Sequence, residues 1–299
     1  MRRTGGLWTG LTSFENLLAA AEAAAAGKRG RPDVAAFLLG LEPEILQLQR
    51  ELRAGIYVPG EYHTFVIREP KRREISAAPF RDRVVHHALT RTLDPIFEKR
   101  FSPYSFACRK GRGTHAALRL AREACARYRY VPQCDIRKYF ATMDHAILED
   151  KLARAVKCGP TLALAGKIIA GSNAQEECLL YFPGDDLFSR LERRRGLPLG
   201  NQTSQFFANV YLDGMDQFVT RQLRPGAYAR YVDDFVLFGE SKAQLRQMRA
   251  EVMDFLEGTG CRRMRGSREL RGAREGYRFW GGGFFRITSG WTGGMWAGL

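Results

Sequence analysis

The spacing of apolar positions along the chain changes from a helical to a strand-like period, and this change predicts a mixed fold. Residues 1–60 carry stripes of helical type, such as Leu17-Leu18 and Ile45-Leu46. Later runs are short and of strand type. Phe235-Val236-Leu237-Phe238 stops at Gly239, which is typical of a buried strand followed by a breaker. The expected fold class is therefore α+β, with helices packed on a sheet.

Two adjacent carboxylates occupy the turn of a predicted hairpin. Asp233 and Asp234 lie between Ala227–Arg230 and the apolar strand 235–238. Like charges side by side repel each other, and a fold tolerates them when a divalent cation lies between them. The alternative, for a pair that stands alone, is a solvated turn.

The pair does not stand alone in the sequence. About a hundred residues earlier an apolar approach from Val131 ends in Asp135, and Asp144-His145 opens a helical pattern. Between these features and the hairpin, a loop at 196–205 leads into an apolar helix predicted over Phe206–Phe218. A strand that delivers a carboxylate just before a helix suits a metal site.

In this order, the strand carboxylate, the glycine loop and the Asp-Asp hairpin resemble motifs A, B and C in the palm of reverse transcriptases. The resemblance implies the fingers and palm of a right-hand polymerase, with an antiparallel palm sheet and packed helices. It also implies RNA-directed DNA synthesis from a template RNA, a primer and dNTPs. Such phosphoryl transfer uses two Mg²⁺ ions roughly 3.5–4 Å apart, for which Mn²⁺ can substitute.

The resemblance also assigns roles to individual residues. It makes Asp135, Asp233 and Asp234 catalytic, with Asp135 and Asp233 bridging both metals and Asp234 supporting the site. The Ile136 carbonyl becomes a further metal ligand. Four backbone amides would face the triphosphate, those of Arg137, Lys138, Tyr139 and Phe140.

Phe140 has a more specific expected role. It lies five residues after Asp135 and matches the bulky residue that excludes a ribose 2′-hydroxyl. The alternative is an ordinary core aromatic.

The segment 61–133 resembles the fingers of the same family. Residues 68–75 predict a β-hairpin with a basic tip, and Lys71 and Arg73 are candidates for clamping the triphosphate. A solvated charge run is the competing interpretation. His86 and His87 are expected to pack or to face solvent, since no partner spacing supports a metal.

The loop before the second helix indicates a subfamily. Leu199-Gly200 followed by Ser204-Gln205 resembles diversity-generating retroelement enzymes, whereas group II intron enzymes usually carry Gln-Gly-x-x-x-Ser-Pro. We assign Leu199, Gly200 and Gln205 to substrate binding. Leu199 cannot offer an amide's hydrogen bonds near the nascent base pair, and apolar contacts discriminate weakly between similar shapes. The rivals are an intron-like or defence-associated reverse transcriptase, and a catalytically inactive RNA-binding remnant.

Composition supports a polyanion partner and excludes some classes. Lys and Arg number 47 against 32 Asp and Glu, a surplus of 15, and the pI is about 9.9, which favours nucleic acid. The six cysteines show no C-x-x-C pair, so a zinc site is not expected. We expect the cysteines to be reduced thiols in a cytoplasm. Leu17–Ala26 contains Glu22 and indicates a helix of a soluble protein, neither a secretory nor a membrane segment. The subfamily also implies a small basic accessory protein.

The expected layout has four parts. A helical region covers 1–60, fingers cover 61–133, and a palm covers 134–258 with a helical insertion at about 151–195. Residues 259–299 are expected to be a degenerate or frame-shifted remnant of the palm end and thumb. Residues 281–299 hold seven glycines and one charge, and one extra base after the Phe279 codon allows the family's Phe-Leu-Gly turn. The alternative is a short glycine-rich tail.

Overall fold

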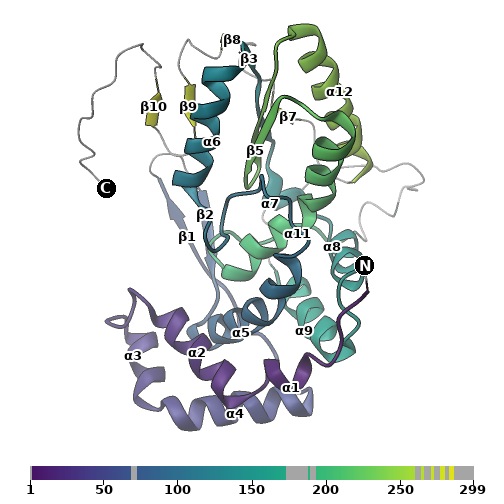
Figure 1. Cartoon of the computed structure of the whole chain (residues 1–299). Helices are drawn as coiled ribbons and strands as arrows, with labels where there is room; N and C mark the ends of the chain where they lie inside the picture. Colours follow the sequence, from purple (N-terminus) through teal and green to yellow (C-terminus); the bar gives the residue numbers. More distant parts are fainter. Residues whose placement is uncertain are drawn as a thin grey trace. The chain divides into compact units, whose positions relative to one another are not determined.

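The protein is a mixed α+β structure of two compact units. The computed structural model describes residues 2–68, 73–172, 188 and 193–259, with short strands at 264–265, 271–272, 277–279 and 283–285 (Figure 1). The first unit comprises Met1–Ser102, Arg137–Met215 and Phe255–Arg263; the second comprises Pro103–Ile136, Asp216–Asp254 and Met264–Leu299. The α+β class is confirmed.

The first unit begins with four helices: α1 (Trp8–Leu11), α2 (Phe14–Ala25), α3 (Pro32–Leu39) and α4 (Leu41–Ala54). Ser13 caps α2, because its side chain accepts a hydrogen bond of 3.1 Å from the backbone N–H of Asn16. Leu17 of α2 is fully buried, and α2 packs against α5 (Phe80–Phe97). Leu17 and Ile45 of the predicted stripes therefore belong to a helical core, whereas Leu46 is exposed.

A two-stranded antiparallel hairpin follows these helices. β1 (His63–Ile67) pairs with β2 (Arg73–Ala77), with His63 opposite Ala77 and Ile67 opposite Arg73. A hairpin is present as predicted, although it starts and ends outside the predicted range 68–75. Its tip, including Lys71, lies outside the described residues.

The rest of the first unit is helical: α7 (Tyr139–Thr142), α8 (His145–Ala153), α9 (Gly159–Ala170) and most of α11 (Gln202–Phe218). Asp144 caps α8 by accepting a hydrogen bond of 3.1 Å from Ile147 N–H. Helix α11 starts before the predicted Phe206, because buried Thr203 and Ser204 extend the helix although no apolar pattern marks them.

The second unit is built on a four-stranded antiparallel sheet in the order β5-β6-β4-β7. The strands are β4 (Gln133–Ile136), β5 (Ala227–Tyr231), β6 (Asp234–Phe238) and β7 (Met264–Arg265). Smaller pairs join β3 (Tyr130–Val131) to β8 (Arg271–Gly272), and β9 (Tyr277–Phe279) to β10 (Gly283–Phe285). The helical elements are α6 (Thr114–Arg127), η1 (Val219–Leu223) and α12 (Lys242–Gly258), whose last turn belongs to the first unit.

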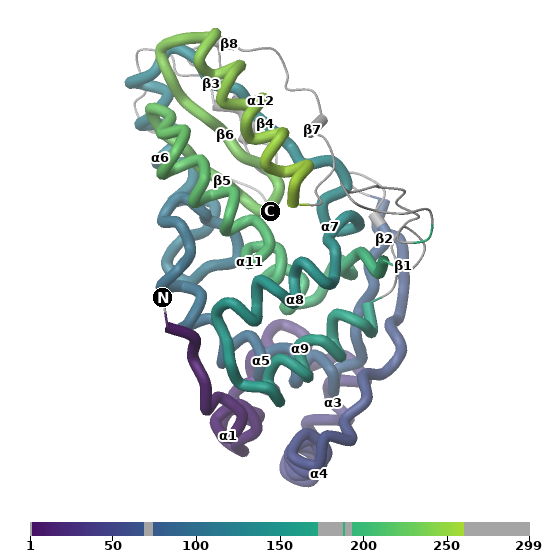
Figure 2. The backbone as a smooth tube through the Cα atoms, turned by 90° about the vertical axis from the view of Figure 1, so that its right-hand side faces the viewer, coloured from purple at the N-terminus to yellow at the C-terminus, as the bar shows by residue number. Residues whose placement is uncertain are grey.

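Strand β6 is buried on both faces. Val236 and Phe238 join a core cluster with Ala121 of α6, whereas the ring of Phe235 lies 6.3 Å from that of Tyr228. Helices α6 and α12 flank these strands (Figure 2). Burial on both faces explains why this strand is an unbroken apolar run rather than an alternating one.

Candidate active site

The predicted catalytic carboxylates meet on neighbouring strands of the second unit. Asp135 on β4 and Asp234 on β6 are direct cross-strand partners, and the Ile136 N–H donates a hydrogen bond of 3.2 Å to the Asp233 carbonyl. All three carboxylate residues are half-buried. Side chains opposite each other on antiparallel strands share a face, with Cβ atoms about 4.5–5.5 Å apart. Two like charges therefore face each other with water only partly excluded.

The turn before these carboxylates has an unusual backbone. Val232 adopts φ +59°, in the left-handed region that a β-branched residue rarely occupies. Tyr231, on its other side, accepts a hydrogen bond of 3.0 Å at its hydroxyl from the hydroxyl of Thr114. The turn thus carries a local conformational cost that its surroundings must offset.

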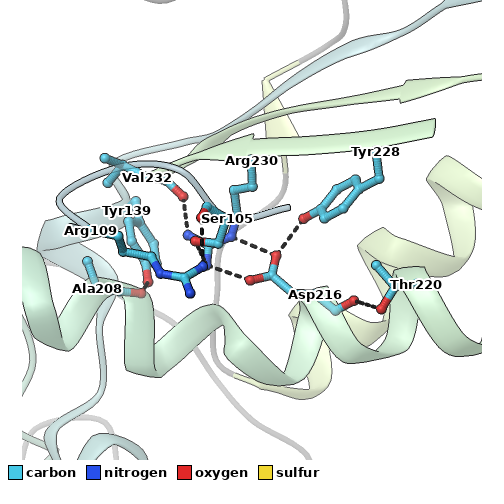
Figure 3. A network of polar contacts seen from close by, with 9 residues as sticks. All are labelled: Ser105, Arg109, Tyr139, Ala208, Asp216, Thr220, Tyr228, Arg230 and Val232. Atoms are coloured by element: carbon cyan, nitrogen blue, oxygen red, sulfur yellow. Dashed lines mark hydrogen bonds and ion pairs between the residues drawn. The ribbon is translucent and has the colours of Figure 1, made fainter. Parts of the chain in front are cut away.

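Behind the turn lies a buried ion pair that the sequence did not single out (Figure 3). Arg230 on β5 and Asp216 at the end of α11 are both fully buried, and their closest contact is 2.6 Å. The hydroxyl of Tyr228 also donates to Asp216, at 2.6 Å, and burial raises the pKa of this phenol well above its usual value. An isolated buried charge costs several kcal/mol, so such groups persist only when every side is satisfied. The available sequence signal was one arginine at an inward position of an apolar strand.

Two neighbours of Asp135 on β4 are apolar in character. Ile136 is fully buried, and its proposed ligand role concerns its carbonyl alone. Burial raises the pKa of the Cys134 thiol to about 12, so this cysteine stays a neutral thiol at physiological pH. Oxygen donors from the aspartates are therefore the relevant ligands here.

The other predicted site residues belong to the first unit. Arg137 and Lys138 are exposed, and Lys138 has φ +53° at the start of α7. Tyr139 is buried, and its hydroxyl donates a hydrogen bond of 2.6 Å to the Ala208 carbonyl. Its ring is thus a packing element, and only its backbone amide is left for the predicted triphosphate contact.

Phe140 is half-buried beside the loop that leads to α11. Its carbonyl accepts a hydrogen bond of 2.8 Å from Leu197 N–H, and its ring lies 5.6 Å from that of Tyr139. The segment after Asp135 and the 196–205 loop are therefore directly joined within the first unit. The sugar-discriminating role of Phe140 stays a prediction.

The 196–205 loop is also tied to strand β2. The Leu199 carbonyl accepts a hydrogen bond of 3.1 Å from Ser76 N–H. Asn201 accepts from Ala78 N–H at 3.1 Å and donates to the Ser76 carbonyl at 2.8 Å. Sequence reasoning did not select Asn201, although it is buried and its side-chain amide bonds two backbone groups at the end of β2.

Gly200 and Gln205 complete the set predicted from this loop. Gly200 has φ +108°, and a Cβ there would lie 2.8 Å from the Ile75 side chain. Only glycine fits this conformation and this close approach. Gln205 is half-buried in α11, and its substrate role stays a prediction.

The basic residues of the hairpin are placed only in part. Arg73 begins β2 opposite Ile67, whereas its side chain, like all of Lys71, lies outside the described residues. His86 is buried and therefore packs in the interior, and this burial lowers its pKa to about 3. Cys108, Cys125, Cys134 and Cys158 form no disulfide with one another in the described part of the chain.

The carboxylates suit a metal ion whose coordination shell is completed by substrate. Within the described ranges, no three His, Cys, Asp or Glu side chains are grouped so that they could hold one ion together. Mg²⁺ in nucleotidyl-transfer sites is commonly bound by one or two carboxylates, with water and substrate phosphates filling the remaining positions. The facing pair of Asp135 and Asp234, next to Asp233, fits that kind of site.

Comparison with known proteins then decides the family. Residues 67–263, more than half of the 299-residue chain, match the family described as reverse transcriptase (RNA-dependent DNA polymerase). The chain belongs to the reverse transcriptase family. The matched range contains all the candidate site residues discussed above.

Individual relatives agree with this family. The chain is 26% identical to Protein YkfC of Escherichia coli (strain K12) over 258 residues, covering 73% of this chain and 65% of that protein. It is 24% identical to group II intron-encoded protein LtrA of Lactococcus lactis over 181 residues, 60% of this chain and 28% of LtrA. It is 38% identical to nuclear intron maturase 2, mitochondrial, of Arabidopsis thaliana over 79 residues, 26% of this chain and 11% of the maturase. The chain thus spans less than two thirds of each of these proteins.

One further finding concerns membranes. None of the helices in the described part of the reverse transcriptase chain is both long and apolar enough to cross a lipid bilayer.

Proposed function

We propose that this protein is an RNA-directed DNA polymerase whose catalytic carboxylates are Asp135, Asp233 and Asp234. One observation carries the proposal: Asp135 and Asp234 are cross-strand partners, with Asp233 in the adjoining turn, in a chain of the reverse transcriptase family. Two facing carboxylates destabilise a sheet unless something compensates their charge. A divalent cation and a triphosphate substrate provide that compensation in nucleotidyl transfer.

The proposed reaction joins a primer 3′-hydroxyl to the α-phosphorus of a dNTP and releases pyrophosphate. Asp135 and Asp233, supported by Asp234 and the Ile136 carbonyl, would hold two Mg²⁺ ions, which stabilise charge on the attacking and leaving oxygens. The strand pairing of β4 with β6 fixes the carboxylates relative to each other. The backbone of residues 137–140, which begins two residues after Asp135, is proposed to face the triphosphate.

Charge supports binding of a nucleic-acid template and primer. The surplus of 15 positive charges favours a polyanion, because neutralised phosphates release counterions. Such binding weakens as salt is raised, and it does not depend on the catalytic carboxylates. Binding and catalysis can therefore be separated by experiment.

The test is primer extension by the purified protein on an RNA template with dNTPs and Mg²⁺. Asp233→Asn should abolish extension while leaving RNA affinity nearly unchanged, because a metal ligand is lost and the net charge changes by only one. Asp150→Asn is the matched control, since Asp150 is 56% exposed in an ion pair with Arg154. A wild-type protein that binds RNA but adds no nucleotide would be the inactive remnant instead.

Within the family, we infer that the enzyme is of the error-prone diversity-generating retroelement type, which would act with a small basic accessory protein. The support is the Leu199-Gly200…Ser204-Gln205 pattern. Leu199→Gln should lower errors opposite template adenine more than opposite other bases, as measured by sequencing cDNA from a defined RNA. Equal error spectra would remove Leu199 from the explanation.

An intron-type enzyme is the second candidate, because LtrA and the maturase are named for introns. The DNA around the gene distinguishes the two. Template and variable repeats beside it favour the retroelement, and intron boundaries around it favour the intron enzyme.

A further inference from the structure

We infer that the Asp216–Arg230 ion pair is a positioning device for the turn that carries Asp233, and that it thereby sets how strongly the carboxylates bind divalent metal. The inference rests on the proposed function and extends it to residues that touch neither substrate nor metal. Both partners lie in the second unit, as do the turn and the carboxylates.

The guanidinium of Arg230 is fixed in orientation by several acceptors. Its Nε donates to Asp216 Oδ1 at 2.7 Å, and its Nη2 donates to Asp216 Oδ2 at 2.6 Å. The same Nη2 donates to the Ser105 hydroxyl at 3.0 Å. A bidentate pair of this kind fixes the plane of the guanidinium as well as its location.

The remaining nitrogen of Arg230 reaches the turn itself. Nη1 donates a hydrogen bond of 2.8 Å to the Val232 carbonyl (Figure 3). Val232 is the residue held at φ +59°, and its carbonyl belongs to the peptide group that leads into Asp233. The charged hydrogen bond therefore acts on the strained peptide immediately before the first carboxylate of the pair.

A reporter of this turn already exists in the sheet. The Asp233 carbonyl accepts a hydrogen bond of 3.2 Å from Ile136 N–H on β4, next to Asp135. If the turn relaxes, this hydrogen bond opens and Asp233 moves relative to Asp135. The exchange rate of the Ile136 amide hydrogen therefore measures the turn without any metal or substrate.

A purely structural role for the ion pair makes a different prediction, and Tyr228 separates the two. Its hydroxyl binds the same Asp216 carboxylate at 2.6 Å, whereas the bond to the turn comes from Arg230 Nη1. Tyr228→Phe should lower stability while the guanidinium still holds Val232. Arg230→Lys keeps the charge but offers a single nitrogen, which cannot reproduce both the bidentate contact with Asp216 and the separate bond from Nη1 to the Val232 carbonyl.

The experiment compares the wild type with Arg230→Lys, Tyr228→Phe and Arg230→Lys/Val232→Gly. Three quantities are measured: the midpoint of urea unfolding, the Ile136 amide exchange rate by NMR, and the Mg²⁺ concentration for half-maximal nucleotide addition. Arg230→Lys should accelerate Ile136 exchange and raise the Mg²⁺ requirement about 10- to 100-fold, the effect typical of losing an outer contact to a metal ligand. Tyr228→Phe should change only the unfolding midpoint.

Glycine at position 232 should restore part of the loss, because glycine adopts positive φ without a tether. If Arg230→Lys does not fold, Ser105→Ala takes its place, with a smaller change in the same direction. The inference is overturned if Ile136 exchange and the Mg²⁺ requirement stay at wild-type values in the folded variant, or if Tyr228→Phe changes them equally. If the wild type adds no nucleotide, the proposed function fails, and Ile136 exchange alone decides the positioning role.

Discussion

In the described part of the chain, a buried aspartate contacts arginine in each unit, and the two contacts differ in kind. Asp216 in the second unit binds Arg230 through both carboxylate oxygens, at 2.7 and 2.6 Å. Asp144 in the first unit lies 3.4 Å from Arg193 Nε and 3.9 Å from Arg195 Nε, and its other oxygen caps α8. The bidentate contact of Asp216 fixes the orientation of the Arg230 guanidinium. Asp144 mainly accepts a backbone N–H at the start of α8, and its two longer contacts add only electrostatic attraction.

The same difference separates what each aspartate controls. Arg230 donates a hydrogen bond to the Val232 carbonyl, in the turn that leads into Asp233. Arg193 and Arg195 instead hold the chain that enters the 196–205 loop, where Gly196 N–H also bonds the Met143 carbonyl at 2.9 Å. Identical residue types thus brace the turn before Asp233 in one unit and anchor the chain that enters a loop in the other.

The strongest way to break this comparison is to remove Asp216. Asp216→Ala leaves the guanidinium of Arg230 buried without its counter-charge, which should lower the free energy of unfolding by about 3–5 kcal/mol. Urea unfolding followed by circular dichroism measures the loss. Asp216→Ala/Arg230→Met should recover part of it, because the orphaned charge is gone. If Asp216→Ala lowered the free energy of unfolding by less than about 1 kcal/mol, the pair would behave like a solvent-exposed ion pair, against the buried arrangement described.

His86 sharpens the comparison, because it is a buried polar group that lacks a charge partner. Its Nδ1 has no hydrogen-bond partner among the residues that the structure describes, and burial lowers its pKa from 6.5 to about 3. Between these values the unfolded chain takes up a proton that the folded chain does not. Stability should therefore fall as the pH falls from 6.5 toward 3, by up to about 1.4 kcal/mol per pH unit.

The measurement for His86 is the unfolding free energy at several pH values for wild type, His86→Gln and His63→Gln. His63 is the matched control because it is exposed on β1. His86→Gln should flatten the acid side of the curve and His63→Gln should leave its slope as in the wild type. Equal slopes in all three proteins would assign the acid sensitivity to other groups.

The smallest expected effect belongs to Asp144. Asp144→Ala removes the cap of α8 and two long ion contacts, for an expected loss of about 1 kcal/mol. Asp144→Asn should recover most of it, since asparagine caps a helix nearly as well. An Asp144→Ala loss as large as that of Asp216→Ala would erase the distinction between the two sites.

Local patterns were enough to predict much of the secondary structure around the three carboxylates, whose catalytic role stays a prediction. The hairpin around Asp233, the strand ending near Asp135 and the cap at Asp144 each depend on a few neighbouring residues. The Asp216–Arg230 pair could not be found in this way, because a charged residue in a sequence does not show whether it is buried or solvated. Burial depends on how a helix end and a strand meet in the folded unit.

The longer-range organisation was also beyond local patterns. Each compact unit draws on three separate chain segments, which only tertiary packing determines. In the glycine-rich end of the chain, β9 and β10 pair with Phe279 opposite Gly283, although their residues show no strand periodicity. The frame-shift interpretation of this end stays a prediction, and most of the residues concerned lie outside the described part.

The central claim, that Asp135 and Asp233 bind divalent metal with Asp234 in support, is tested most directly by cleavage of the backbone with bound Fe²⁺. Fe²⁺ replaces Mg²⁺ at such oxygen sites, and with ascorbate and peroxide it generates radicals that cut the nearest peptide bonds. We expect cuts near Asp135 and in the 232–234 turn, suppressed by excess Mg²⁺ and absent in Asp233→Asn. Cuts elsewhere only, or the same cuts in Asp233→Asn, would contradict the assignment.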